Sequence, residues 1–193
     1  MKRLAVYCGS ASPADPIYID TARAVGRDLA ERGIGIVYGG GRLGLMGAVA
    51  DAALEAGGEV IGVIPEALVN AEVAHRELTE LRVVQNMHER KALFTDLSDG
   101  FLTIPGGVGT MDELWEAVSW SQLGYHEKPV GLLNVAAYFD HLVAFAAHMA
   151  EIGFVRPQHR NILIVGDRLD SLLDRMESYE PHQTIFRMKA EDL

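Results

Sequence analysis

Residues 100–113 read GFLTIPGGVGTMDE. The apolar run Gly100–Ile104 is typical of a buried strand, and the turn Pro105–Gly109 contains three glycines. The following segment, Thr110–Leu123, has apolar residues at helical spacing. A strand that enters a helix through a short turn is the first half of a βαβ unit. This stretch therefore predicts a parallel sheet with helices packed against it.

The same alternation runs along the rest of the chain. Apolar runs predict further strands at Lys2–Cys8, Ile34–Tyr38, Glu59–Ile64, Leu81–Gln85, Pro129–Leu133 and Ile162–Val165. Helical periodicity predicts helices at Ile17–Arg32, Leu43–Ala56, Met87–Leu97, Tyr138–Glu151 and Leu169–Ser178. We expect an α/β fold, a doubly wound, Rossmann-like parallel sheet with helices on both faces. Residues 1–193 are expected to form one such domain, with 179–193 as a variable tail.

The composition narrows the class of protein. The chain has 193 residues, of which 49% are hydrophobic and 23% charged, as in globular proteins. A net charge of −10 argues against nucleic-acid binding, and no apolar run reaches the ~18 residues that span a membrane. The single cysteine, Cys8, cannot form an internal disulfide, which favours the cytoplasm; a buried thiol is the simpler interpretation than a nucleophile. The seven histidines form no metal-binding pattern, so no metal is expected.

The predicted topology places the ligand site. In open α/β sheets, ligands bind beyond the carboxyl ends of the strands, where the strand order reverses. Those ends are followed here by three turns of small residues: Gly9-Ser10, then Gly39-Gly40-Gly41, then Gly106-Gly107-Val108-Gly109-Thr110. We expect the three turns to converge on one edge of the sheet, so that Gly9, Ser10, Gly40 and Gly41 contact the ligand.

The glycine turns allow different ligands. Gly39, Gly41 and Gly44 fit the spacing of a dinucleotide fingerprint, but the nearest acid, Glu59, begins the next strand, at the wrong end for a ribose. A tight turn or a mononucleotide site fits as well. The turn Pro105–Thr110 leads directly into a helix, whose unbonded N–H groups favour an anion. It lacks the Gly-Lys-Ser/Thr ending of triphosphate sites, so either a single phosphate or a purely structural turn is expected.

Two charged residues are placed at the same edge by counting βα units. Arg90 and Glu113 each lie near the start of a helix that follows a predicted strand. A carboxylate beside a phosphate site suits glycosidic cleavage, in which positive charge develops on the sugar. The alternatives are structural: Thr110 and Glu113 have the spacing of a capping box, and Arg90 has the spacing of a surface partner for Glu89 or Asp96.

Two motifs carry a resemblance to a known family. Residues 87–91 read MHERK and residues 105–113 read PGGVGTMDE. In this order they resemble the LONELY GUY family of cytokinin riboside 5′-monophosphate phosphoribohydrolases. The resemblance, which covers about Arg3–Val165, implies hydrolysis of the N-glycosidic bond of adenine-type nucleoside 5′-monophosphates. It implies Arg90 and Glu113 as the catalytic pair, a phosphate-binding loop Gly106–Thr110, and further substrate-binding residues Glu72, Met87, Lys91, Asp112 and Ser119.

The resemblance also bears on cofactors and partners. Family members were once labelled lysine decarboxylases, yet pyridoxal phosphate needs a lysine, and only Lys91 of the four lysines lies near the predicted site. We therefore expect no cofactor. The expected partners are a nucleoside 5′-monophosphate and a second copy of the chain, since the family implies a homodimer. The alternative is a non-catalytic carrier of a phosphorylated heterocycle, similar to the molybdenum cofactor carriers.

Overall fold

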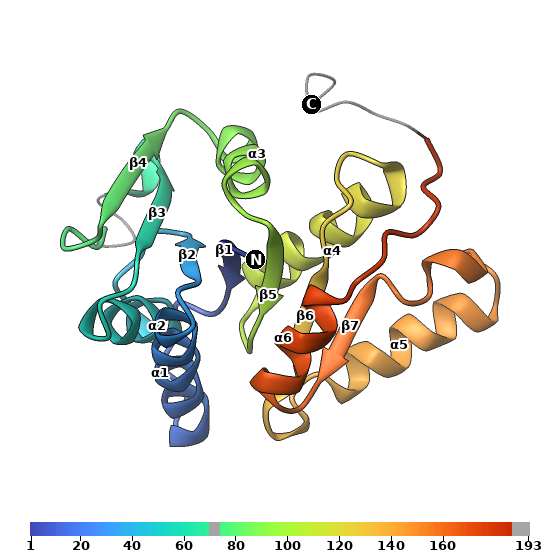
Figure 1. The fold of residues 1–193 in the computed structure, drawn as a ribbon, viewed down its shortest axis with the longest axis horizontal. Helices are drawn as coiled ribbons and strands as arrows, with labels where there is room; N and C mark the ends of the chain where they lie inside the picture. The colour runs from blue at the N-terminus through green and yellow to red at the C-terminus, as the bar shows by residue number, and fades with distance from the viewer. Residues whose placement is uncertain (70–73, 187–193) are drawn as a thin grey trace.

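The computed structural model describes residues 1–69 and 74–186. Its seven strands form one parallel sheet in the order β4-β3-β2-β1-β5-β6-β7, which crosses the middle of Figure 1. The strands are β1 (Arg3–Tyr7), β2 (Gly35–Tyr38), β3 (Val60–Pro65), β4 (Glu80–Val84), β5 (Gly100–Thr103), β6 (Val130–Leu133) and β7 (Leu163–Gly166). All seven were predicted. The Rossmann-like class is thereby confirmed.

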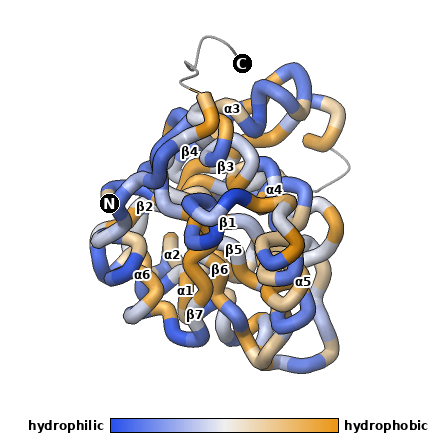
Figure 2. The backbone as a smooth tube through the Cα atoms, turned by 90° about the vertical axis from the view of Figure 1, so that its right-hand side faces the viewer, coloured by the Kyte–Doolittle hydropathy of each residue, from blue (hydrophilic) through white to orange (hydrophobic). Residues whose placement is uncertain are grey.

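Helices cover both faces of this sheet. They are α1 (Pro16–Glu31), α2 (Gly44–Glu55), α3 (Met87–Leu97), α4 (Val108–Leu123), α5 (Asp140–Glu151) and α6 (Leu169–Glu177). Apolar residues of α1, α2 and α6 share one core cluster, and those of α3, α4 and α5 share the other. Figure 2 shows the hydrophobic stretches of β5 and β6 in the middle of the molecule, between these layers. None of the helices among the described residues is long and apolar enough to cross a membrane.

The strand order reverses at β1. The chain builds β2, β3 and β4 outward on one side of β1, and α3 then returns it to β5 on the other side. β1 pairs with both neighbours in parallel, with Leu4 opposite Ile36 of β2 and Gly100 of β5. The carboxyl ends of β1, β2 and β5 therefore frame the switch point at which such sheets bind ligands.

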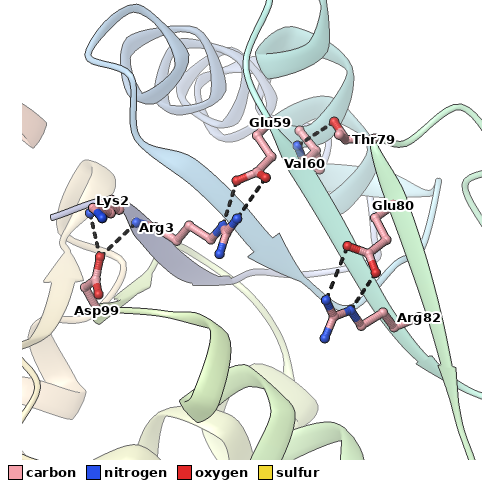
Figure 3. A network of polar contacts seen from close by, with 8 residues as sticks. All are labelled: Lys2, Arg3, Glu59, Val60, Thr79, Glu80, Arg82 and Asp99. Atoms are coloured by element: carbon pink, nitrogen blue, oxygen red, sulfur yellow. Dashed lines mark hydrogen bonds and ion pairs between the residues drawn. The ribbon is translucent and has the colours of Figure 1, made fainter.

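At the amino ends of the strands, opposite the switch point, charged side chains form ion pairs and hydrogen bonds (Figure 3). Arg3 donates to both carboxylate oxygens of Glu59, from Nε at 2.7 Å and Nη2 at 2.9 Å, and these bonds lower the pKa of Glu59. Asp99 accepts hydrogen bonds from the backbone N–H groups of Lys2 and Arg3. Glu59 thus stabilises the amino ends of the strands, opposite the edge where ligands bind, so it takes no part in a dinucleotide site, as its position in the sequence predicted.

Candidate active site

A pocket of about 240 Å³ lies at the carboxyl ends of β1, β2 and β5. Hydrogen bonds join the turns that surround it: the Gly9 N–H donates to the Pro105 carbonyl at 3.1 Å, and the Met46 N–H donates to the Gly9 carbonyl at 3.2 Å. The pocket is lined by Val6, Cys8, Gly9, Ser10, Gly39, Met46, Arg90, Gly107, Val108, Gly109, Thr110 and Glu113. The convergence expected of the three turns is therefore present in the structure.

Arg90 is a buried cation held by the backbone. Its side chain, from the second turn of α3, donates from Nε to the Val63 carbonyl at 3.1 Å and from Nη2 to the Gly39 carbonyl at 3.2 Å. The guanidinium also lies 5.5 Å from the ring centre of Phe94. A Cβ atom at position 39 would lie 2.2 Å from Nη2, so glycine is required there by the approach of Arg90. The alternative of a surface partner for Glu89 or Asp96 is wrong.

Glu113 faces this cation from α4. Its Oε1 lies 4.0 Å from Arg90 Nη2, and its side chain is 14% exposed. The charge of Glu113 also acts on its neighbours: burial raises the pKa of Cys8 and of Tyr7, and the nearby carboxylate raises both further. Cys8 therefore remains a neutral thiol in the pocket wall, as its interpretation as a buried residue predicted. The arrangement presents one carboxylate and one guanidinium to the same small volume.

The capping-box alternative for Glu113 is wrong. Helix α4 begins at Val108, two residues earlier than predicted, and its N-cap is Gly107, which makes no side-chain capping bond. Thr110 is consequently the third helical residue and is buried. A capping arrangement is found instead at α3, where Asn86 Oδ1 accepts from the Glu89 N–H at 2.9 Å and Glu89 Oε2 accepts from the Gln85 N–H at 2.9 Å.

The glycine turn before α4 has a geometry that favours an anion. Gly107, Val108 and Gly109 line the pocket at the first turn of a 16-residue helix, where N–H groups lack helical acceptors and the dipole is positive. Gly106 lies behind them: a Cβ there would lie 2.1 Å from Thr110 Oγ1 and 2.7 Å from the Gly9 nitrogen. The turn is therefore packed too closely for any other residue at position 106.

Several predicted residues lie outside the pocket. Lys91 Nζ forms ion pairs with Asp112 Oδ2 at 2.8 Å and Glu116 Oε1 at 3.2 Å. Asp112 and Ser119 line a separate depression on the outer side of α4. Met87 is 42% exposed, and its sulfur lies 3.7 Å from Arg90 Nη1, so it contacts Arg90 without lining the pocket.

In the second glycine turn, Gly39-Gly40-Gly41, the first residue lies in the pocket and the other two lie outside it. Gly39, which was not among the predicted ligand residues, lines the pocket, whereas Gly40 and Gly41 contact the loop after β3. The Gly40 carbonyl accepts from the N–H of buried His75 at 2.9 Å. Glu72 lies outside the described residues.

Besides Gly39, sequence reasoning missed three further contacts of the site. Met46 lines the pocket from the first turn of α2, and its position directly after the Gly39–Gly44 turn was the available signal. Val6 forms part of the floor. Tyr138 reaches the glycine turn from the far side, with its hydroxyl donating to the Gly106 carbonyl at 2.6 Å. No sequence pattern indicated this last contact, because Tyr138 was assigned to a helix that begins only at Asp140.

The lysines do not suit pyridoxal phosphate. Lys91 is held by two carboxylates, and Lys128 Nζ donates to the carbonyls of Ser98, at 2.7 Å, and of Thr95. Lys2 lies at the amino edge of the sheet, and Lys189 is outside the described residues. Within residues 1–69 and 74–186, no group of three or more histidine, cysteine and acidic side chains is placed to hold a metal ion.

Fold and site together define an α/β protein with a Rossmann-like sheet and, at its switch point, a glycine turn at a helix start beside a buried Arg–Glu pair. The family model described as "possible lysine decarboxylase" matches residues 46–176. The chain is 46% identical to the probable cytokinin riboside 5′-monophosphate phosphoribohydrolase LOGL9 of Oryza sativa subsp. japonica, over 93% of this chain and 79% of that protein. It is 43% identical to the cytokinin riboside 5′-monophosphate phosphoribohydrolase LOG7 of Arabidopsis thaliana, over 93% and 83%. This chain belongs to the LONELY GUY family.

Solved structures with the same fold include carriers. The molybdenum cofactor binding protein from Rippkaea orientalis superposes with a TM-score of 0.66 at 21% identity, over 91% of this chain and 95% of that chain. The Moco carrier protein from Chlamydomonas reinhardtii gives 0.66 at 19% identity, with the same coverage. At this level of identity the likeness concerns the fold alone.

Proposed function

We propose that this protein hydrolyses the N-glycosidic bond of cytokinin riboside 5′-monophosphates and of AMP, releasing the free base and ribose 5-phosphate. The observation that carries the proposal is the 4.0 Å approach of Arg90 Nη2 and Glu113 Oε1 inside a pocket that also contains the glycine turn. The names of the enzymes at 41–46% identity support the same reaction. The carriers of similar fold reach only about half that identity.

The pocket suits the charge changes of this reaction. As the bond to the base breaks, the sugar acquires oxocarbenium character, and a carboxylate beside it stabilises the developing positive charge or activates water. Glu113 is the only carboxylate that lines the described pocket. The first turn of α4, Gly107–Thr110, would hold the 5′-phosphate and so place the sugar near Glu113.

Adenine release from AMP tests the proposal. Purified protein incubated with AMP, or with N6-isopentenyladenosine 5′-monophosphate, is expected to release free base, measured by chromatography, and Glu113→Gln is the matched inactive control. Binding of the nucleotide without release of base would support the carrier instead. The phosphate is expected to supply binding energy that is used in the transition state, so kcat/KM for AMP should greatly exceed that for adenosine. Equal values would contradict the assignment of the phosphate site.

We propose further that the protein works as a homodimer. The outer side of α4 carries a depression lined by Trp115 and Trp120, and a second apolar pocket of about 300 Å³ lies between α4 and α5 and shares Trp115. Phe145 is 57% exposed and Phe154 83% exposed on the same side of the sheet. An apolar surface of this extent suits a second copy of the chain. Sedimentation should give twice the monomer mass, and a monomer at all concentrations would refute this.

We also place the protein in the cytoplasm. Its single thiol, Cys8, is free and buried, and burial raises its pKa. Such a residue contributes no disulfide and needs no oxidising compartment. Cell fractionation with an antibody to the native protein tests this location.

A further inference from the structure

Tyr138 connects three segments around the glycine turn. It lies in the loop after β6, just beyond the single turn Val135–Ala137, and its hydroxyl donates to the Gly106 carbonyl at 2.6 Å. Its ring meets the Tyr18 ring of α1 edge-on, with centroids 5.8 Å apart. One side chain thus joins the elements that follow β1, β5 and β6.

The backbone that carries Tyr138 is strained. Ala136 and Ala137 have φ values of +49° and +61°, and they are the only residues other than glycine with positive φ among those described. This conformation is unfavourable for a residue with a Cβ atom. Asn134 stabilises the loop: its Oδ1 accepts from the Phe139 N–H at 2.7 Å, and its Nδ2 donates to Asp140 Oδ1 at 2.7 Å. Strain of this kind persists where the surrounding contacts impose it, which is common at functional sites.

The bond to Gly106 fixes the direction of another group. A trans peptide is planar, so the carbonyl of Gly106 and the N–H of Gly107 point in opposite directions. With glycine on both sides, this peptide meets little steric resistance to rotation. Gly106 packs against Gly9 on one side and is held by Tyr138 through its carbonyl. Gly107 lines the pocket, and its N–H donates to no acceptor in the described part of the chain.

We propose that Tyr138 is a positioning residue that locks the Gly106–Gly107 peptide, so that the Gly107 N–H stays directed at the 5′-phosphate of the substrate. The proposal rests on the phosphate site of the proposed function and adds a residue to it. Tyr138 does not contact the substrate. Its hydroxyl prevents rotation of the glycine peptide, so the anion meets an N–H group that is already oriented, and the cost of ordering it at binding is avoided.

Ligand binding by Tyr138→Phe tests the lock. Calorimetry should show affinities for AMP and ribose 5-phosphate weakened by about tenfold, the equivalent of one hydrogen bond between neutral groups, with adenosine unaffected. In turnover, the effect should appear in KM more than in kcat. Tyr18→Phe is the matched control, because it removes a hydroxyl that has no partner among the described residues and keeps the ring contact. Equal losses for adenosine and AMP, or an unchanged affinity for AMP, would overturn the proposal.

Hydrogen–deuterium exchange provides a readout that needs no ligand. In Tyr138→Phe, a peptide covering residues 104–110 should exchange faster than in the native protein, and in Tyr18→Phe it should not. Unchanged exchange in Tyr138→Phe would overturn the lock even if the protein hydrolyses AMP. A different outcome is faster exchange in a protein that neither binds nor cleaves AMP. That result would refute the proposed function. It would also overturn the role assigned to Tyr138, because there would be no bound phosphate for the Gly107 N–H to contact.

Discussion

Arg90 Nη2 lies 4.0 Å from Glu113 Oε1, and each residue comes from a different helix on the same face of the sheet. The guanidinium is fixed by two backbone carbonyls, whereas the carboxylate projects from α4 beside the anion-binding turn. Arg90 is therefore the rigid member of the pair, and Glu113 is the member adjacent to the space for substrate. Its two halves should respond differently to substitution.

Glu113→Gln is expected to lower kcat by on the order of a hundredfold or more, because the amide keeps the shape of the side chain and loses the charge that the oxocarbenium needs. The free energy of unfolding should change by less than about 1 kcal/mol, since Arg90 keeps its carbonyl acceptors. Glu116→Gln is the matched control, as it neutralises an acid on the same helix outside the pocket. Wild-type turnover in Glu113→Gln would show that its carboxylate is not catalytic. Kinetics and thermal melting supply both measurements.

Arg90→Lys should damage stability as well as activity. The planar guanidinium of Arg90 donates to the Val63 and Gly39 carbonyls and also faces Glu113. The single ammonium group of lysine cannot make these contacts at the same time. We expect the free energy of unfolding, measured in urea, to fall by about 1–3 kcal/mol because a buried acceptor loses its donor. The corresponding change at Arg82, which is partly exposed and pairs with Glu80, should cost far less. Equal losses at the two positions would contradict the anchoring role of Arg90.

Ala137→Gly should stabilise the protein. Glycine adopts the φ of +61° without the Cβ conflict, and this gain exceeds the backbone entropy that glycine adds to the unfolded state. A net gain of about 0.5–1 kcal/mol corresponds to a rise in Tm of roughly 1–4 °C for a chain of this size. Glycine at Ala11, whose backbone is not in the left-handed region, should give no rise. A lower Tm for Ala137→Gly would show that the loop is not strained.

Acid should destabilise the protein through His126. This side chain is 5% exposed; its Nε2 donates to the Ala117 carbonyl at 2.9 Å and its Nδ1 accepts from the Lys128 N–H, so the neutral form is required. Burial, aided by the nearby Lys128 charge, lowers its pKa from 6.5 to about 4. A lowered pKa in the folded state means that the stabilisation is complete above pH 6.5 and is lost as the pH falls towards 4.

The size of this effect can be measured by urea unfolding across that pH range. The difference in pKa corresponds to about 3 kcal/mol. His126→Gln should remove this part of the pH dependence, whereas His141→Gln, at an exposed position on α5, should leave it intact. A His126→Gln protein whose stability still falls by the same amount would assign the effect to other groups.

Periodicity and turn chemistry were sufficient for the architecture. All seven strands were predicted within two residues at either end, because six of them are almost continuous apolar runs and the edge strand β4 still carries Leu81, Val83 and Val84. The convergence of Gly9, Gly107 and Arg90 followed from the rule that parallel strands end at one edge. These features depend on local sequence and on topology, and both are visible in a single chain.

The start of α4 and the long-range side-chain contacts were not predictable in the same way. A threonine at position 110 imitates an N-cap, but the close packing of Gly106 against Gly9 lets the helix begin at Val108. Tyr138 reaches Gly106 across 32 positions only because Ala136 and Ala137 adopt a conformation that alanine rarely takes. Asp112 was expected to line the pocket but faces Lys91, because the helical register of α4 turns it away from Glu113.

The acceptors that hold Arg90 are main-chain oxygens, and this affects how the sequence can diverge. No replacement of the side chain at Val63 removes the carbonyl that the guanidinium uses, so core packing, and not the cation, limits which apolar residue stands there. Gly39 differs, because any side chain there would collide with Nη2. Relatives of this protein should therefore exchange Val63 for other apolar residues and keep glycine at position 39. The main chains of Val63 and Gly39 both hold the Arg90 guanidinium, but only Gly39 would stand out as conserved for this reason in an alignment.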